Sequence, residues 1–218
     1  MSKVEWTYAL ADIERCFGKA AIELTRLESA KDAGELRDSW ERFLEEFAKA
    51  IGKMISYSIS STNLKPFGHR LKNASQINDT GLIYLREARN SSVHGLEPIA
   101  EYFDKSVSVD GMIRIEGSCN LHFSNNIING VNTGTYDLKV KDGKVSEISG
   151  RPNSNITETP PYFNLIPVVN PDKKLRALVP NEIFGKNIGQ QGPIALAIRA
   201  MGGLKDRLDE FNSLGARY

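Results

Sequence analysis

The residues best suited to chemistry lie close together, between positions 84 and 95 of the chain. This stretch contains an arginine, an asparagine directly after it and a histidine four residues further on: Arg89, Asn90 and His94. A guanidinium group is planar and permanently charged, and it can bond two oxygens of one phosphate. An imidazole has an ordinary pKa of about 6.5, so it can exchange a proton at neutral pH. These residue types therefore predict phosphate binding with acid–base chemistry beside it.

The same stretch resembles the motif of the HEPN family, which is an arginine, commonly followed by a polar residue such as asparagine, and then a histidine after a gap of four to six residues. The resemblance covers roughly the first 105 residues in helix order. It implies a metal-independent RNA endonuclease that needs no cofactor, with Arg89, Asn90 and His94 as its catalytic residues. The 2′-hydroxyl of RNA would attack the adjacent phosphorus and leave 2′,3′-cyclic phosphate and 5′-hydroxyl ends. Family members often act in phage defence or as toxins.

The spacing of the motif constrains how one helix can present it. On a regular helix with about 100° per residue, Arg89 and His94 point about 140° apart, whereas Asn90 and His94 differ by about 40°. Either the last helical turn unwinds before Gly95, or two copies of the motif meet across a twofold axis. The family resemblance implies the second arrangement, a homodimer with a composite active site. Such a site supplies two histidines, one as base and one as acid.

Each of these residues also has a purely structural interpretation. His94 could cap carbonyl groups at a helix C-terminus, and Asn90 could only close the helix end. Arg89 could form a surface ion pair, for example with Glu97. Arg86, one turn before Asn90, is expected either in the substrate cleft or on a solvated face.

A second basic cluster precedes the motif and is expected to help bind the substrate. It consists of His69, Arg70 and Lys72. Between positions 65 and 94, the sequence has five lysine or arginine residues and two aspartate or glutamate residues, a net charge of +3. This balance predicts a modest patch that follows an RNA backbone, although a merely solvated face fits the composition equally well.

Helical periodicity positions the motif. Apolar residues recur at three-to-four spacing from Trp6 to Leu27 and again from Leu36 to Ile55, which predicts two long amphipathic helices joined near Gly34. A loop is expected over 56–63 and a short helix after Pro66. Another helix is expected to begin at Asn78 or Asp79 and to end at Gly95, and Pro98 to begin a short helix through Phe103.

After Lys105 the chain changes to short β-branched and aromatic runs separated by turn residues, which predict a small antiparallel sheet. Asp142-Gly143 is a strong signal for a type I′ hairpin. The proline-rich segment 150–180 is expected to be mostly loop, with a strand near 166–169, and a helix is expected from Pro193. The predicted fold class is α+β, with a HEPN-like antiparallel helical bundle at 1–105 and a β-rich domain with a C-terminal helix at 106–218.

Composition excludes several other classes of function. The formal net charge is +1, so any site for an anion must be local. The two cysteines lie far apart and the three histidines lack ligand spacing, so no metal site is expected. No apolar run reaches the roughly 20 residues of a membrane span, and a reducing cytoplasm is the expected location. The glycine-rich segment 185–192 lacks the lysine and serine of a phosphate-binding loop.

Two functions from different classes fit these observations. The first is a homodimeric RNA endonuclease, and the second is a catalytically silent HEPN-like dimer that serves as a binding or scaffold module. The complete set of Arg89, Asn90 and His94 favours the first. In either case the β-rich region 106–218 is a candidate for contact with a regulatory protein or ligand.

Overall fold

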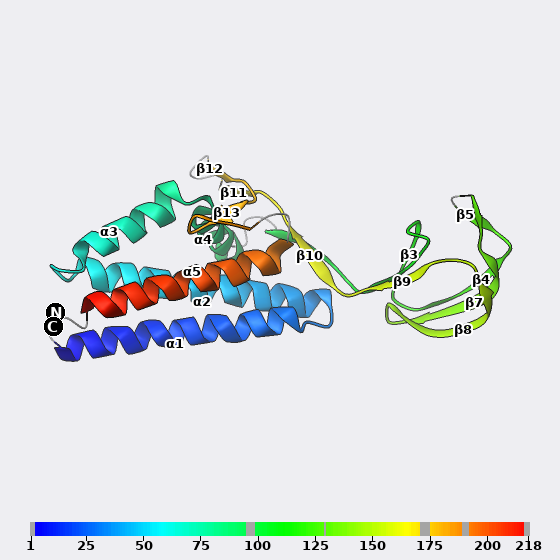
Figure 1. The fold of residues 1–218 in the computed structure, drawn as a ribbon, viewed down its shortest axis with the longest axis horizontal. Helices are drawn as coiled ribbons and strands as arrows, with labels where there is room; N and C mark the ends of the chain where they lie inside the picture. Colours follow the sequence, from blue (N-terminus) through cyan, green and yellow to red (C-terminus); the bar gives the residue numbers. More distant parts are fainter. Residues whose placement is uncertain (1–2, 95–98, 129, 171–174, 189–191, 216–218) are drawn as a thin grey trace. The chain divides into compact units, whose positions relative to one another are not determined.

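The computed structural model describes residues 3–94, 99–128, 130–170, 175–188 and 192–215. The chain is an α+β protein, as predicted, with helices at both ends and small antiparallel sheets between them (Figure 1). It divides into two compact units. The first comprises Met1–Ser29, Arg37–Glu101 and Asn164–Tyr218, and the second comprises Ala30–Leu36 and Tyr102–Phe163.

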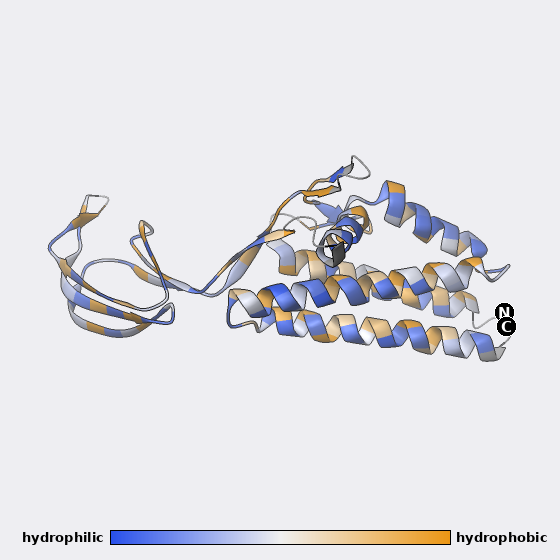
Figure 2. Ribbon diagram, turned by 180° about the vertical axis from the view of Figure 1, so that it is seen from behind, coloured by the Kyte–Doolittle hydropathy of each residue, from blue (hydrophilic) through white to orange (hydrophobic). Residues whose placement is uncertain are grey.

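The helices follow the predicted order. Their bounds are α1 Lys3–Glu28, α2 Ala33–Ile59, α3 Lys65–Asn73, a π-helical turn η1 Ala74–Asn78, α4 Thr80–His94 and α5 Gly192–Gly215. The amphipathic pattern accounts for α1 and α2, along which hydrophobic and hydrophilic residues interleave (Figure 2). Their apolar stripes are buried, with Ile13, Trp40 and Phe43 all fully enclosed. The second helix runs to Ile59, so the connection expected from residue 56 begins only at Ser60.

The C-terminal helix belongs to the helical unit. Figure 1 shows α5 alongside α1, and the two helices are in contact. The ring centroid of Phe211 on α5 lies 4.5 Å from the ring centroid of Trp6 on α1 and 6.1 Å from that of Phe67 on α3. Phe211 is completely buried. The last helix therefore closes the hydrophobic core of the first unit.

This arrangement differs from the two consecutive domains expected from the sequence. The expected boundary at 105–106 lies close to the first crossing, at Glu101–Tyr102, but the chain returns to the helical unit at Asn164. The β-rich unit is thus an insertion between α4 and α5, and residues 164–218 belong with the helices. The chain leaves through β1 Ala100–Phe103 and returns through β10 Tyr162–Leu165, which pair with each other.

The second unit is built from two three-stranded antiparallel sheets and a small hairpin. Their strands are β2 Ser106–Val109, β3 Ile113–Glu116, β4 Cys119–Ser124, β5 Ile127–Ile128, β6 Val131–Asn132, β7 Gly134–Lys141, β8 Lys144–Pro152 and β9 Ile156–Thr159. Alternate residues of β7 face inward. Tyr136, Leu138 and Val140 pack with Val107 and Phe123 in the hydrophobic core of the second unit. The period-two pattern read from the sequence therefore explains this core.

The hairpin predicted at Asp142-Gly143 is confirmed. These residues connect β7 to β8 with φ angles of 50° and 67°, as a type I′ turn requires. A Cβ added at Gly143 would overlap the carbonyl oxygen of Lys105. Glycine is needed here for both the backbone angle and the space.

Short strands also occur in two segments where the sequence predicted other structure. No strand was expected at 100–103, and only one was expected in the proline-rich segment 150–180. The helix predicted through Phe103 is wrong over Ala100–Phe103, which forms β1, while Gly95 and Pro98 lie outside the described residues. Pairing with β10, about sixty positions along the chain, overrides the local helix signal. The proline-rich segment contains three strands besides β9, in place of the one predicted, and a hairpin follows it. The bounds are β10 as above, β11 Val168–Asn170, β12 Leu175–Ala177, β13 Glu182–Ile183 and β14 Lys186–Asn187.

None of the helices described here combines the length and the apolar character needed to cross a membrane.

Candidate active site

Helix α4 carries the motif, and its start is fixed by a side chain. Oδ1 of Asp79 accepts a hydrogen bond from the backbone N–H of Leu82 at 2.9 Å, which satisfies a donor that the first helical turn leaves open. Asp79 is therefore the N-cap, one of the two residues expected to begin this helix. Tyr84, Leu85 and Ala88 bury one face of α4 in the core of the helical unit. Arg89 and Asn90, on other sides of the same helix, are only half-buried.

Arg86 is engaged within the protein. Its Nη2 lies 2.7 Å from Oε1 of Glu87, and its Nη1 donates to the carbonyl oxygen of Ser75 at 3.0 Å. The Glu87 side chain is only 1% exposed, so the guanidinium compensates a carboxylate removed from water. The hydrogen bond from Arg86 to Ser75 ties α4 to η1. Arg86, expected either in the substrate cleft or on a solvated face, thus forms a structural ion pair. Arg86 does not line the pocket of Arg89.

Arg89 and Asn90 do contact each other. Nη1 of Arg89 donates to Oδ1 of Asn90 at 3.3 Å, and both side chains are half-buried. Arg89 opens onto a polar pocket of about 350 Å³ between α2 and α4, with Ser92 on the same wall. Nε of Arg89 is buried and has no hydrogen-bond partner among the described residues. The asparagine orients the guanidinium, and the guanidinium retains donors for a ligand.

The rest of this pocket is strongly charged. Helix α2 contributes four residues to it: Asp38, Glu41, Arg42 and Glu45. A hydrogen bond from Lys49 at 2.8 Å and, more weakly, the charge of Arg89 lower the pKa of Glu45, so this carboxylate stays ionised at neutral pH. Three carboxylates therefore face two guanidinium groups. The pocket of a single protomer is not basic.

His94 is the last residue of α4, and its side chain lies outside the described part of the structure. The helical backbone nevertheless continues from Arg89 to His94 without interruption. The unwinding considered as one way to align the two residues therefore does not occur up to His94. A regular helix leaves their Cα–Cβ bonds about 140° apart.

The second basic cluster lies on another helix. His69, Arg70 and Lys72 are exposed on α3. Arg70 forms an ion pair with Glu210 of α5 at 2.7 Å and lines a different pocket, which shares no residue with the pocket of Arg89. The structure thus brings Arg89 and Asn90 together but does not bring the α3 cluster to them.

The carboxylates on α2 were not singled out from the sequence, although their spacing carries a signal. Asp38, Glu41 and Glu45 are three and four residues apart, which places them on one helical face. This face lies beside Arg89 because of the way α2 packs against α4. A local sequence pattern does not predict that packing. Within the described ranges, no group of three or more histidine, cysteine, aspartate or glutamate side chains could hold a metal ion.

Comparisons of the chain with known protein families, with curated proteins and with solved structures gave no match.

Proposed function

We propose that the protein is a homodimeric, metal-independent RNA endonuclease of the HEPN type. The observation that supports this most is the pairing of Arg89 and Asn90 on one turn of α4, beside a polar pocket and on the helix that His94 ends. The family resemblance extends the proposal to a cytoplasmic role in phage defence or as a toxin.

The proposed reaction is a transesterification. Arg89 binds the scissile phosphate and stabilises the charge that develops on its oxygens, and the hydrogen bond to Asn90 fixes the direction of the guanidinium. One His94 takes the proton from the 2′-hydroxyl, whose oxygen attacks phosphorus. The bond from phosphorus to the 5′-oxygen breaks, and a second His94 protonates that oxygen. The products are a 2′,3′-cyclic phosphate and a 5′-hydroxyl.

The continuous helix supports the dimeric part of the proposal. Because α4 stays helical through His94, ideal helix geometry directs the Cα–Cβ bonds of Arg89 and His94 in one protomer about 140° apart. In a dimer with a twofold axis, the Arg89 of one protomer can lie opposite the His94 of the other. Sedimentation of the purified protein should therefore show a dimer. A monomer at all concentrations would remove the basis for a shared cleft.

The acidic residues around Arg89 favour one alternative function. Asp38, Glu41 and Glu45 outnumber the two arginines of the pocket, and they would oppose a nucleic-acid backbone. A dimeric binding or scaffold module without turnover is the second candidate. In that case Arg89 would serve only as the partner of these carboxylates.

Cleavage of a short RNA in the presence of a chelator separates the two candidates. The endonuclease should cut the RNA, leave cyclic phosphate ends and fail to cut a substrate with a single 2′-deoxy residue at the cleavage position. Arg89→Lys should retain little activity because an ammonium cannot make the two-pronged phosphate contact. Arg199→Lys is a matched control, since Arg199 is exposed on α5 and lies outside the Arg89 pocket. Intact RNA, or equal cleavage of the 2′-deoxy substrate, would contradict the proposal.

A further inference from the structure

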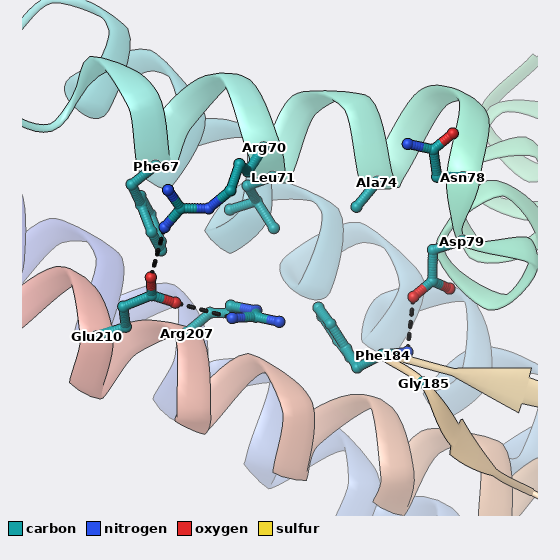
Figure 3. Close-up of a pocket in the computed structure, with 10 residues that line it drawn as sticks. All are labelled: Phe67, Arg70, Leu71, Ala74, Asn78, Asp79, Phe184, Gly185, Arg207 and Glu210. Carbon is teal, nitrogen blue, oxygen red and sulfur yellow. Dashed lines mark hydrogen bonds and ion pairs between the residues drawn. The ribbon is translucent and has the colours of Figure 1, made fainter.

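A second pocket in the helical unit has the chemistry of a small-molecule site. It has a volume of about 360 Å³ and lies between α3 with η1 on one side and α5 with the β13–β14 hairpin on the other (Figure 3). This volume is within the range of about 300–1,000 Å³ typical of ligand pockets. None of Arg89, Asn90, Asp38, Glu41 or Glu45 lines it. The pocket is therefore separate from the proposed ribonuclease site.

One end of the pocket is cationic. Arg70 from α3 and Arg207 from α5 both contact the carboxylate of Glu210, at 2.7 and 2.8 Å (Figure 3). Two guanidinium groups share one carboxylate, which leaves one positive charge in excess. The contacts with Glu210 use a single terminal nitrogen of each arginine. The remaining N–H groups can bind the oxygens of a second anion, for which arginine forks are well suited.

A flat apolar surface lies next to this cationic end. Phe184 projects from the β13–β14 turn into the pocket, and Figure 3 shows it between Arg207 and Asp79, facing α3 and η1. The guanidinium carbon of Arg207 lies 6.0 Å from the centre of the Phe184 ring. The small side chain of Ala74 lies opposite the ring and leaves space above it. A planar ring could stack there, with its anionic substituent at the two arginines.

The backbone at Phe184 is held in an unusual conformation. Its φ is +51°, a value that a bulky side chain rarely adopts, and Gly185 follows with a φ of +69°. Oδ2 of Asp79 accepts the N–H of Phe184 at 2.6 Å and so secures the turn. The ring fits against Gly203 of α5, where any Cβ would overlap it. Asparagine or glycine would form this turn more easily, so phenylalanine has a local conformational cost at this position.

The far end of the pocket is polar but not cationic. Asn78 is exposed at the rim, and its amide offers both a donor and an acceptor. Both oxygens of Asp79 already accept backbone N–H groups, from Leu82 and Phe184. The order along the pocket is thus a guanidinium pair, an aromatic surface and a polar end with the Asn78 amide and the Asp79 carboxylate.

We infer that this pocket binds a nucleoside monophosphate, with its phosphate on Arg70 and Arg207, its base stacked on Phe184 and the edge of the base at Asn78. A phosphate, a planar ring and a hydrogen-bonding edge are the three features of a mononucleotide, in the order that the pocket presents them. This inference does not rest on the proposed ribonuclease activity. Its failure would leave that proposal unchanged.

Isothermal titration calorimetry of the full chain tests the inference, with AMP and UMP as probes and with adenosine and inorganic phosphate as separate arms. At least one nucleotide should bind more tightly than adenosine and phosphate do. Arg207→Gln should weaken that binding roughly 10- to 100-fold, because a charge-assisted hydrogen bond to phosphate is lost. Arg199→Gln, an exposed change on the same helix, should not alter it.

A second variant guards against a loss of folding in Arg207→Gln. Ala74→Phe fills the space opposite Phe184 without changing any charge, and it should abolish nucleotide binding while the thermal unfolding transition remains. Any one of three results would overturn the inference. They are the absence of nucleotide binding at millimolar concentration, binding of inorganic phosphate as tight as that of the nucleotide, and nucleotide binding that both variants retain.

Discussion

Replacing Arg86 by methionine should destabilise the helical unit substantially. Arg86 compensates the buried carboxylate of Glu87 and also binds the carbonyl oxygen of Ser75. Removing one partner of a buried ion pair typically costs about 3–5 kcal/mol, since the other charge remains in a poorly solvated place. The Arg86 side chain is itself 29% exposed, so water can replace part of its contribution. We therefore expect a loss of about 2–3 kcal/mol in the free energy of unfolding.

Urea denaturation followed by circular dichroism of the helices measures this loss. With a slope of about 2–3 kcal/mol per molar urea for a protein of this size, the midpoint should fall by roughly 1 M. The double variant Arg86→Met with Glu87→Gln should recover part of the loss, because the buried charge that Arg86 compensates is then removed as well. A single variant as stable as the wild-type protein but weaker in RNA binding would refute this reasoning. Such a result would instead support a role for Arg86 in binding the RNA substrate.

Two further predictions concern stability alone. The hydrogen bond from Lys53 is the main cause that lowers the pKa of Asp12 to about 2, so this carboxylate stabilises the fold above its ordinary pKa of 3.8 and less as the pH falls toward 2. Asp12→Asn should therefore cost about 1 kcal/mol at neutral pH, and unfolding curves of the two proteins should converge between about pH 4 and pH 2; a constant difference would contradict this. Gly203→Ala should lower the melting temperature, because the new Cβ would overlap the Phe184 ring, whereas Gly202→Ala meets open space and should raise it. Equal shifts in the two alanine variants would show that Phe184 does not pack there.

Local patterns predicted the elements whose causes are local. The three-to-four spacing that begins at Trp6 predicted α1, and Asp142-Gly143 predicted the turn between β7 and β8. The strand at Ala100–Phe103 was read as helix because its cause is the pairing with Tyr162–Leu165, which lies far along the chain. The place of α5 was missed for the same reason, since it depends on the contact between Trp6 and Phe211.

The candidate site was predictable to a similar extent. The adjacency of Arg89 and Asn90 follows from neighbouring positions on one helix, and the structure adds the hydrogen bond between them. The carboxylates that share the pocket come from α2, and no pattern near Arg89 indicates them. The basic residues at 69–72 were grouped with the motif by charge alone. They lie on α3, and the pairing of Arg70 with Glu210 shows that a charge balance along the sequence does not fix a common surface.

The most direct test of the proposed function compares wild-type protein with His94→Ala on RNA in the presence of a chelator, after both have been shown to fold. His122→Ala is the matched control, because His122 is an exposed histidine on β4 that contacts Asp137 at 2.7 Å, outside the Arg89 pocket. Loss of general acid–base catalysis should reduce the cleavage rate of His94→Ala by roughly 10²- to 10⁴-fold, while His122→Ala cleaves as the wild type does. Equal cleavage by His94→Ala and wild type, or no cleavage by the wild type, would contradict the proposed ribonuclease.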